Sequence, residues 1–365
     1  MTSSRHIFTS ESVSEGHPDK VCDLIADSIL DAYLERDPGS RVACEVMVKG
    51  GHVVLGGEIT SGATVDHEAV ARETIREIGY TDASEPFNAD GVRVTQIISR
   101  QAAEIGQGVS VGGAGDQGIM FGYASAETPE LMPLPILLAH ALSKKLADER
   151  KSGAIPWLRP DAKTQVSVVY EDGEPVEVAT VLVSTHHTAD VTQSDIRCYV
   201  EQRLIPSVLG AWARPGIEVL VNPAGSFLEG GPSADAGVTG RKIIVDSYGG
   251  MGRHGGGAFS GKDATKVDRS GAYFSRFVAR EVVRQGLARR AEVQVGYAIG
   301  RAQPVSVRVD TFGTGDSRAA EELVSTFDFR PQAIIERFQL RRPIYRQTTN
   351  YGHFGRRGLP WEGGA

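Results

Sequence analysis

One local pattern recurs three times along the chain, and it limits the possible folds more than any other feature of the sequence. Each copy contains two predicted strands joined by a tight turn, followed by an amphipathic helix. The copies occupy residues 41–79, 165–209 and 292–327. Because they lie much farther apart than solenoid repeats do, each copy must bury its own sheet. We therefore predict an α+β fold of three similar domains related by pseudo-threefold symmetry, each a mixed sheet covered by helices.

The turns and linkers support this division. In the second copy, Asp172-Gly173 separates two apolar segments, as in a β-hairpin with a two-residue turn. Glycine-rich stretches near Ser110 and Gly230 lie between the copies, where linkers are expected. We therefore place the domain boundaries so that the domains span residues 1–110, 111–230 and 231–365.

Charge and composition exclude several classes of protein. A net charge of −7 with 41% hydrophobic residues is typical of a globular protein and not of one that binds nucleic acid or an anionic membrane. The longest apolar run, at 131–142, contains two prolines and is too short to cross a bilayer. The N-terminus lacks the apolar segment of a signal peptide, and the three cysteines show no metal-binding spacing. We expect a cytoplasmic protein with Cys22 and Cys44 in its core.

The first predicted helix carries a regular stripe of carboxylates. It is expected to begin at Pro18, which suits the first helical position. The stripe consists of Asp19, Asp23, Asp27 and Asp31. Four-residue spacing favours a solvated face. Asp19 differs from the others because it lies in the first turn beside His17, where a carboxylate favours the helix dipole and could also hold a cation.

A basic, glycine-rich segment at residues 247–263 follows a run at 241–246 that has the composition of a strand. Part of it matches a dinucleotide-binding fingerprint, but no helix is predicted to begin at the third glycine, Gly255. Another part matches a P-loop, but Asp263 occupies the position that needs Ser or Thr. The bare amides with nearby lysines can still bind several phosphates. Charge alone leaves open a chance cluster of surface cations.

Eight segments, taken together, resemble the motifs of the methionine adenosyltransferase (S-adenosylmethionine synthetase) family, in the family's order. They are residues 8–20, 57–60, 113–118, 157–163, 239–246, 249–262, 266–270 and 351–356. The resemblance implies three interlocked α+β domains. It also implies synthesis of S-adenosyl-L-methionine from ATP and L-methionine, with release and hydrolysis of triphosphate. The implied cofactors are Mg²⁺, two per site, and K⁺. The implied assembly is a homodimer with shared active sites, or a tetramer.

The resemblance also assigns roles to individual positions. The implied catalytic residues are His17, Lys163, Arg241, Lys262, Lys266 and Asp268. The implied ATP contacts are His17, Asp161, Lys163, Ser226, Phe227, Asp235, Arg241, Lys242, Ala258 and Lys262. The implied methionine contacts are Glu58, Gln101, Asp116, Asp235 and Lys266. The implied metal ligands are Asp19 and Asp268 for magnesium and Glu45 for potassium.

The chain departs from the family pattern at two places. The lid between Gln101 and Gly113 is shorter than usual, and Ser226 stands where the family usually has Arg. Two other functions remain alternatives. A kinase or ATPase could use the same phosphate-binding loop without methionine, and a non-catalytic subunit would be expected to lose the charged residues that are present here.

Overall fold

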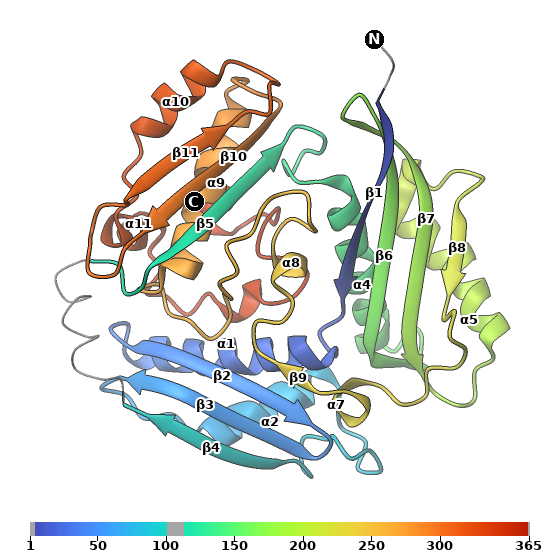
Figure 1. Cartoon of the computed structure of the whole chain (residues 1–365). Coiled ribbons are helices and arrows are strands. Elements are labelled where there is room, and N and C mark those ends of the chain that lie inside the picture. Colours follow the sequence, from blue (N-terminus) through green and yellow to red (C-terminus); the bar gives the residue numbers. More distant parts are fainter. Residues whose placement is uncertain (1–3, 101–112, 364–365) are drawn as a thin grey trace.

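The computed structural model describes residues 4–100 and 113–363, which form three sheets backed by helices (Figure 1). The α+β fold class is confirmed. All three predicted hairpins are present: β2 (Arg41–Lys49) with β3 (His52–Thr60), β6 (Leu158–Glu171) with β7 (Glu174–His187), and β10 (Arg290–Tyr297) with β11 (Ser306–Asp310). In the turn between β6 and β7, Asp172 and Gly173 have φ angles of +51° and +84°. Both are positive, as a two-residue type I′ hairpin turn requires.

Along the chain, each hairpin is preceded by a long helix and followed by a shorter one. The long helices that precede the hairpins are α1 (Pro18–Arg36), α4 (Leu134–Lys151) and α9 (Val267–Arg284). The helices that follow are α2 (His67–Ile78), α5 (Gln193–Tyr199) and α10 (Ser317–Ser325). The helix predicted up to Leu209 is present, because α5 continues through a π-helical turn at Val200–Leu204 into α6 (Ile205–Leu209).

The three sheets exchange strands in a closed cycle. The strand before α1 is β1 (Arg5–Val13), and it pairs with β6 of the second hairpin. The strand before α4 is β5 (Gly118–Ser125), and it pairs with β10 of the third hairpin. The short strand β9 (Gly237–Val238), which precedes α9, pairs with β2 of the first hairpin. Each sheet therefore contains an edge strand from a part of the chain that does not supply its hairpin.

Two of the sheets contain a fourth strand. The first has β4 (Arg93–Ser99) parallel to β3, and the second has β8 (Glu218–Val221) parallel to β7. These two sheets are mixed, as predicted. In the described residues the third sheet has the order β11-β10-β5 and is antiparallel throughout.

The inner faces of the sheets pack on the long helices. Along β2, Val42, Cys44, Val46 and Val48 are buried, and the alternate residues lie on the outer face. Cys22 of α1 is buried as well, so the prediction of two core cysteines is confirmed. No helix in the described ranges combines the length and the apolar character that crossing a bilayer would need.

The prediction of a strand at residues 241–246 is wrong. Instead, residues 237–238 form β9, and Gly240, with a φ of +77°, turns the chain away from the sheet. The following residues form one helical turn, α8 (Ile243–Asp246). The β-branched run has strand propensity, but the edge of β2 is already occupied by other segments, so tertiary packing decides the conformation.

The remaining short elements lie between α6 and the C-terminal end of the described chain. They are α7 (Gly231–Ala234), α11 (Pro331–Phe338) and single 3₁₀ turns at Gly210–Trp212, Arg346–Thr348 and Pro360–Glu362. The first helix after the glycine-rich loop is α9, which begins at Val267. As expected, no helix begins at Gly255, so the geometry of a dinucleotide fingerprint is missing.

Candidate active site

The loop between β1 and α1 brings the first candidate residues against β6. Ser14 Oγ donates a hydrogen bond to the carbonyl of Pro160 at 2.6 Å. Val13, the last residue of β1, is paired with Lys163 of β6. His17 lies four residues after Val13, and the positive charge of Lys163 is one of the influences that lower its pKa. The segment that leads into α1 and the start of β6 thus meet at one place.

His17 is the N-cap of α1 and is neutral. Its Nδ1 accepts a hydrogen bond from the amide of Asp19 at 3.1 Å. Burial, reinforced by the positive charge of Lys242, lowers the pKa of the His17 imidazole to about 3. Since Nδ1 acts as an acceptor, the single ring proton is on Nε2. His17 therefore offers one N–H donor at neutral pH.

Asp19 lies between two cations of the C-terminal third. Lys242 Nζ is 2.6 Å from its Oδ2, and a guanidinium nitrogen of Arg241 is 3.7 Å from its Oδ1. Oδ1 also accepts a hydrogen bond from the Val238 amide at 3.0 Å. Burial opposes ionisation of Asp19, but the hydrogen bonds from Lys242 and Val238 outweigh it and lower the pKa. Asp19 is ionised and joins α1 to the segment after β9.

A second charged group lies at the start of α9. Lys262 Nζ is 2.6 Å from Asp268 Oδ2, and Lys266 Nζ is 2.5 Å from Asp263 Oδ2. The glycine-rich loop passes close to them, because a Cβ at Gly257 would lie 2.2 Å from Asp268 Oδ1. Two lysines and two carboxylates are thus held together where the loop enters the helix.

The third group lies where β6 begins. Asp161 is buried, and its Oδ2 accepts a hydrogen bond from the Gly231 amide at 2.8 Å. Its Oδ1 is buried with no partner among the described residues. Burial, with a smaller contribution from the charge of Asp235, raises the pKa of Asp161 to about 6. Close in sequence to Gly231, the ring of Phe227 stacks on His186 with centroids 5.5 Å apart.

The candidate methionine and potassium residues lie on exposed surfaces. Glu45 and Glu58 project from the outer face of the first sheet, and Asp116 precedes β5. Partial desolvation raises the pKa of Glu45 against the opposing charge of Lys262, and the charge of Glu58 adds to the rise. Glu45 is therefore within electrostatic range of both Lys262 and Glu58. Gln101 and the predicted lid lie outside the described residues.

Two further candidates belong to the nucleotide set. Ser226 is exposed beside Phe227. Ala258 touches the loop that precedes Arg241, since its Cβ would be 2.4 Å from a Cβ placed at Gly240. The two cation-bearing loops are therefore in contact with each other.

The carboxylate stripe of α1 is buried for most of its length, so the prediction that it forms a solvated face is wrong. Asp19, Asp23 and Asp27 are all buried. Every member of the stripe accepts a hydrogen bond from backbone amides of the C-terminal third. The pairs are Asp19 with Val238, Asp23 with Gly240, Asp27 with Gly261, and Asp31 with Tyr345 and Arg346. The four-residue period aligns acceptors for another part of the chain.

Known proteins resemble this chain along its whole described length. Family models of the N-terminal, central and C-terminal domains of S-adenosylmethionine synthetase match residues 5–103, 111–227 and 229–363, respectively. An S-adenosylmethionine synthase of Sorangium cellulosum (strain So ce56) is 55% identical over 374 residues, covering 98% of this chain and 87% of that protein. The chain belongs to the S-adenosylmethionine synthetase family.

Membership in the S-adenosylmethionine synthetase family confirms the resemblance seen in the motifs and the assignment to a transferase. Sequence reasoning missed the cations that neutralise the stripe from within. Lys20 Nζ lies 3.0 Å from Asp23 and 2.6 Å from Asp246, and Arg269 lies 2.7 Å from Asp27. Lys20 and Asp246 are inside the matching motifs, but only the three-dimensional structure shows that they form one buried network with α1.

In this member of the S-adenosylmethionine synthetase family, the residues present fit magnesium that is shared with a substrate. Within residues 4–100 and 113–363, no three His, Cys, Asp or Glu side chains are grouped so that they could hold a metal ion. Magnesium is usually held by one or two carboxylates together with substrate phosphates. Asp19 and Asp268 are hard oxygen donors of this kind, and each lies beside a lysine.

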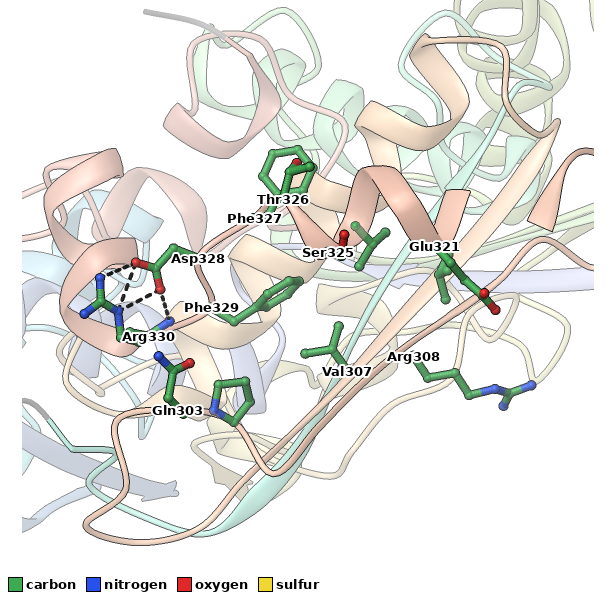
Figure 2. A pocket seen from close by; sticks show the side chains of 13 residues that line it. Gln303, Val307, Arg308, Glu321, Ser325, Thr326, Phe327, Asp328, Phe329 and Arg330 are labelled. Atoms are coloured by element: carbon green, nitrogen blue, oxygen red, sulfur yellow. Dashed lines mark hydrogen bonds and ion pairs between the residues drawn. The ribbon is translucent and has the colours of Figure 1, made fainter. Parts of the chain in front are cut away.

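A cavity of about 580 Å³ lies elsewhere, along the outer edge of β11 (Figure 2). Strand β11, helix α10 and residues 326–330 line it, with Val307 and Phe329 among the apolar side chains. None of the candidate residues belongs to this lining. In this member of the S-adenosylmethionine synthetase family, the cavity along β11 is thus separate from the candidate charged groups.

Proposed function

We propose that the chain catalyses attack of the methionine sulfur on C5′ of ATP, which forms S-adenosyl-L-methionine and triphosphate. The sulfur lone pair forms the new S–C5′ bond while the C5′–O bond breaks, and its electron pair leaves with the triphosphate. The triphosphate is then hydrolysed to pyrophosphate and phosphate. Because neutral sulfur needs little activation, the main requirement is to stabilise a highly charged leaving group.

The gathering of cations from separate parts of the chain supports this proposal more than any other observation. Lys163 comes from β6, Arg241 and Lys242 from the segment after β9, Lys262 from the glycine-rich loop, and Lys266 from the N-cap of α9. His17 adds a neutral N–H donor beside them. Such oriented donors and charges stabilise a developing polyanion without reorganising during the reaction.

Each of the other candidate groups has a role in the proposal. Bound magnesium would be held by Asp19 and Asp268 and would neutralise phosphate charge, and Glu45 is assigned to potassium. Asp161 has a free acceptor oxygen suited to a donor on the nucleotide, and Phe227 offers an aromatic face for the base. Asp235 and Ser226 complete the nucleotide side. Methionine is assigned to Glu58, Gln101, Asp116, Asp235 and Lys266.

The exposed face of the first sheet supports a homodimer with shared sites. Met47 of β2 is 47% exposed and Ile97 of β4 is 68% exposed. Glu45 and Glu58 belong to the same face, as shown by the register of β2, β3 and β4. Apolar side chains around candidate site residues suit contact with a second copy. A tetramer would need a further surface.

The decisive experiment measures S-adenosylmethionine by mass spectrometry after incubation with ATP, methionine, magnesium and potassium. We expect formation that requires methionine and magnesium and is accelerated by potassium. Lys262→Ala should lower kcat by at least about a hundredfold, because an oriented charge that meets a developing anion contributes that much. The control is Lys144→Ala, which removes only an exposed pair with Asp148 on α4. A rate of ATP cleavage that is the same with and without methionine would favour the kinase or ATPase alternative.

A further inference from the structure

The two loops that carry the candidate phosphate-binding cations are fastened to one face of α1. Asp23 Oδ1 accepts a hydrogen bond from the Gly240 amide at 2.8 Å, directly before the first pair of cations. One helical turn later, Asp27 Oδ1 accepts a hydrogen bond from the Gly261 amide at 2.9 Å, directly before Lys262. Both carboxylates are fully buried. The spacing of one helical turn in α1 therefore fixes the spacing of the loops.

Both anchored residues are glycines in the left-handed region. Gly240 has a φ of +77° and Gly261 a φ of +79°. An added Cβ would lie 2.4 Å from Ala258 Cβ at the first position and 2.0 Å from the Cys44 carbonyl oxygen at the second. Because these residues reverse the chain just before the cations, the orientation of each amide sets the direction in which the next side chains leave the loop.

We propose that Asp23 is a positioning residue of the polyphosphate site, which acts by holding the Gly240 amide and thereby orienting Arg241 and Lys242. The inference rests on the proposed function for the identity of the anion, a linear polyphosphate. Asp23 does not itself face that anion, because it is fully buried and lies 3.0 Å from Lys20 Nζ. Its contribution is the geometry of the two cations.

Asp23 can be tested more cleanly than the other members of the stripe. Asp19 itself pairs with Lys242, so its replacement would remove a charge from the site. Asp27 is paired with the buried Arg269 at 2.7 Å, and its loss would leave that cation uncompensated. When Asp23 is removed, Lys20 still has Asp246 at 2.6 Å.

The test compares Asp23→Ala with Asp23→Asn, using inorganic tripolyphosphate as the binding probe. Alanine removes the acceptor for Gly240, whereas asparagine keeps an oxygen at the same place and loses only the charge. We expect Asp23→Ala to weaken tripolyphosphate binding and to lower kcat by at least about tenfold each, because small displacements of catalytic groups have effects of this size. Asp23→Asn should restore most of both, and KM for methionine should change little in either variant.

Asp31→Ala is the matched control. Asp31 is on the same helix and also accepts backbone amides, but those of Tyr345 and Arg346, which precede none of the candidate cations. Its replacement should leave tripolyphosphate binding unchanged. If Asp23→Ala does not fold, Asp23→Val, which fills the space without an acceptor, takes its place.

Three results would overturn the proposal. They are unchanged binding in Asp23→Ala, an Asp23→Asn variant as weak as the alanine variant, and an equal loss in Asp31→Ala. The first would show that the anchor is dispensable, the second that charge matters and not the hydrogen bond, and the third that any loosening of α1 has this effect. If tripolyphosphate binding depends on Asp23 as expected but the wild-type chain forms no S-adenosylmethionine, only the proposed function is contradicted.

Discussion

Asp161 is a single residue whose titration the fold changes in a measurable way. Its Oδ1 is buried without a partner in the described part of the chain, and burial raises its pKa from the ordinary 3.8 to about 6. The folded protein therefore keeps a proton that the unfolded chain releases over this range. The stability that comes from this proton is fully present below about pH 4 and is lost as the pH rises through about 6.

Replacing this carboxyl group by a neutral amide should remove that pH dependence. We expect the free energy of unfolding of Asp161→Asn, relative to wild type, to increase by about 2 kcal/mol between pH 4 and pH 7, because most of the pKa shift falls within this range. Denaturant unfolding of both proteins across this range measures the difference. Curves that stay parallel from pH 4 to pH 7 would show that Asp161 ionises normally in the folded protein.

Individual residues also show how far the sequence alone can lead. The period of the stripe on α1 was visible, and so was the special position of Asp19 beside His17. The burial of Asp23 was not predictable, because its partner amide at Gly240 is more than two hundred positions away in the chain. A carboxylate that accepts a distant backbone amide has the same local sequence as one that faces water.

Among the elements, β5 and α9 approach each other unusually closely. Gly122 of β5 lies on the backbone of α9, and an added Cβ would be 1.9 Å from the carbonyl carbon of Ser275. We expect Gly122→Ala to destabilise the protein by at least about 2 kcal/mol, because neither backbone can move aside easily. Thermal or denaturant unfolding measures this loss.

A matched strand glycine provides the control for that prediction. At Gly56 in β3, the one described atom within 4 Å of an added Cβ would be the Ile97 carbonyl oxygen, at 3.8 Å. Gly56→Ala should therefore change stability by well under 1 kcal/mol. Equal losses in the two variants would mean that glycine in a strand matters for its flexibility and not for the contact with α9.

The predicted elements with clear periodicity are present in the structure, and the failure among them has a physical cause. The hairpins and α2 follow directly from alternating and helical patterns. The run at 241–246 has the same strand-like composition, but residues 237–239 and 261–263 already make the hydrogen bonds along the free edge of β2. Without a neighbouring strand, the run coils into α8 and buries Asp246 next to Lys20.

At the scale of the whole molecule, the proposed shared site can be tested by complementation. An inactive Asp116→Asn chain and an inactive Lys262→Ala chain, unfolded together and refolded in equal amounts, should recover about a quarter of wild-type activity. Random pairing gives about half heterodimers, each with one intact site of two. Activity no higher than that of either parent would mean that both residues act within one chain, and sedimentation would show whether that chain is a monomer.

The strand exchange was outside the reach of sequence analysis, although three similar domains were expected. Strand β9 has only two residues, so it leaves no recognisable pattern. Strands β1 and β5 have ordinary strand sequences that do not indicate which sheet they join. Which sheet each strand joins depends on how the long helices pack. That packing arises only when distant parts of the chain meet.

The closed cycle of strands also determines when each sheet can be completed during synthesis of the chain. β5 leaves the ribosome long before β10, its partner in the third sheet, has been translated. At about 5–20 residues per second, the delay is roughly 10 to 30 seconds. During that time both edges of β5 are unpaired. In the same way, one edge of β2 has no partner until β9 has been translated. A nascent chain of this protein therefore exposes strands that need protection until synthesis is nearly finished, so chaperones that bind extended apolar segments should act on it before release.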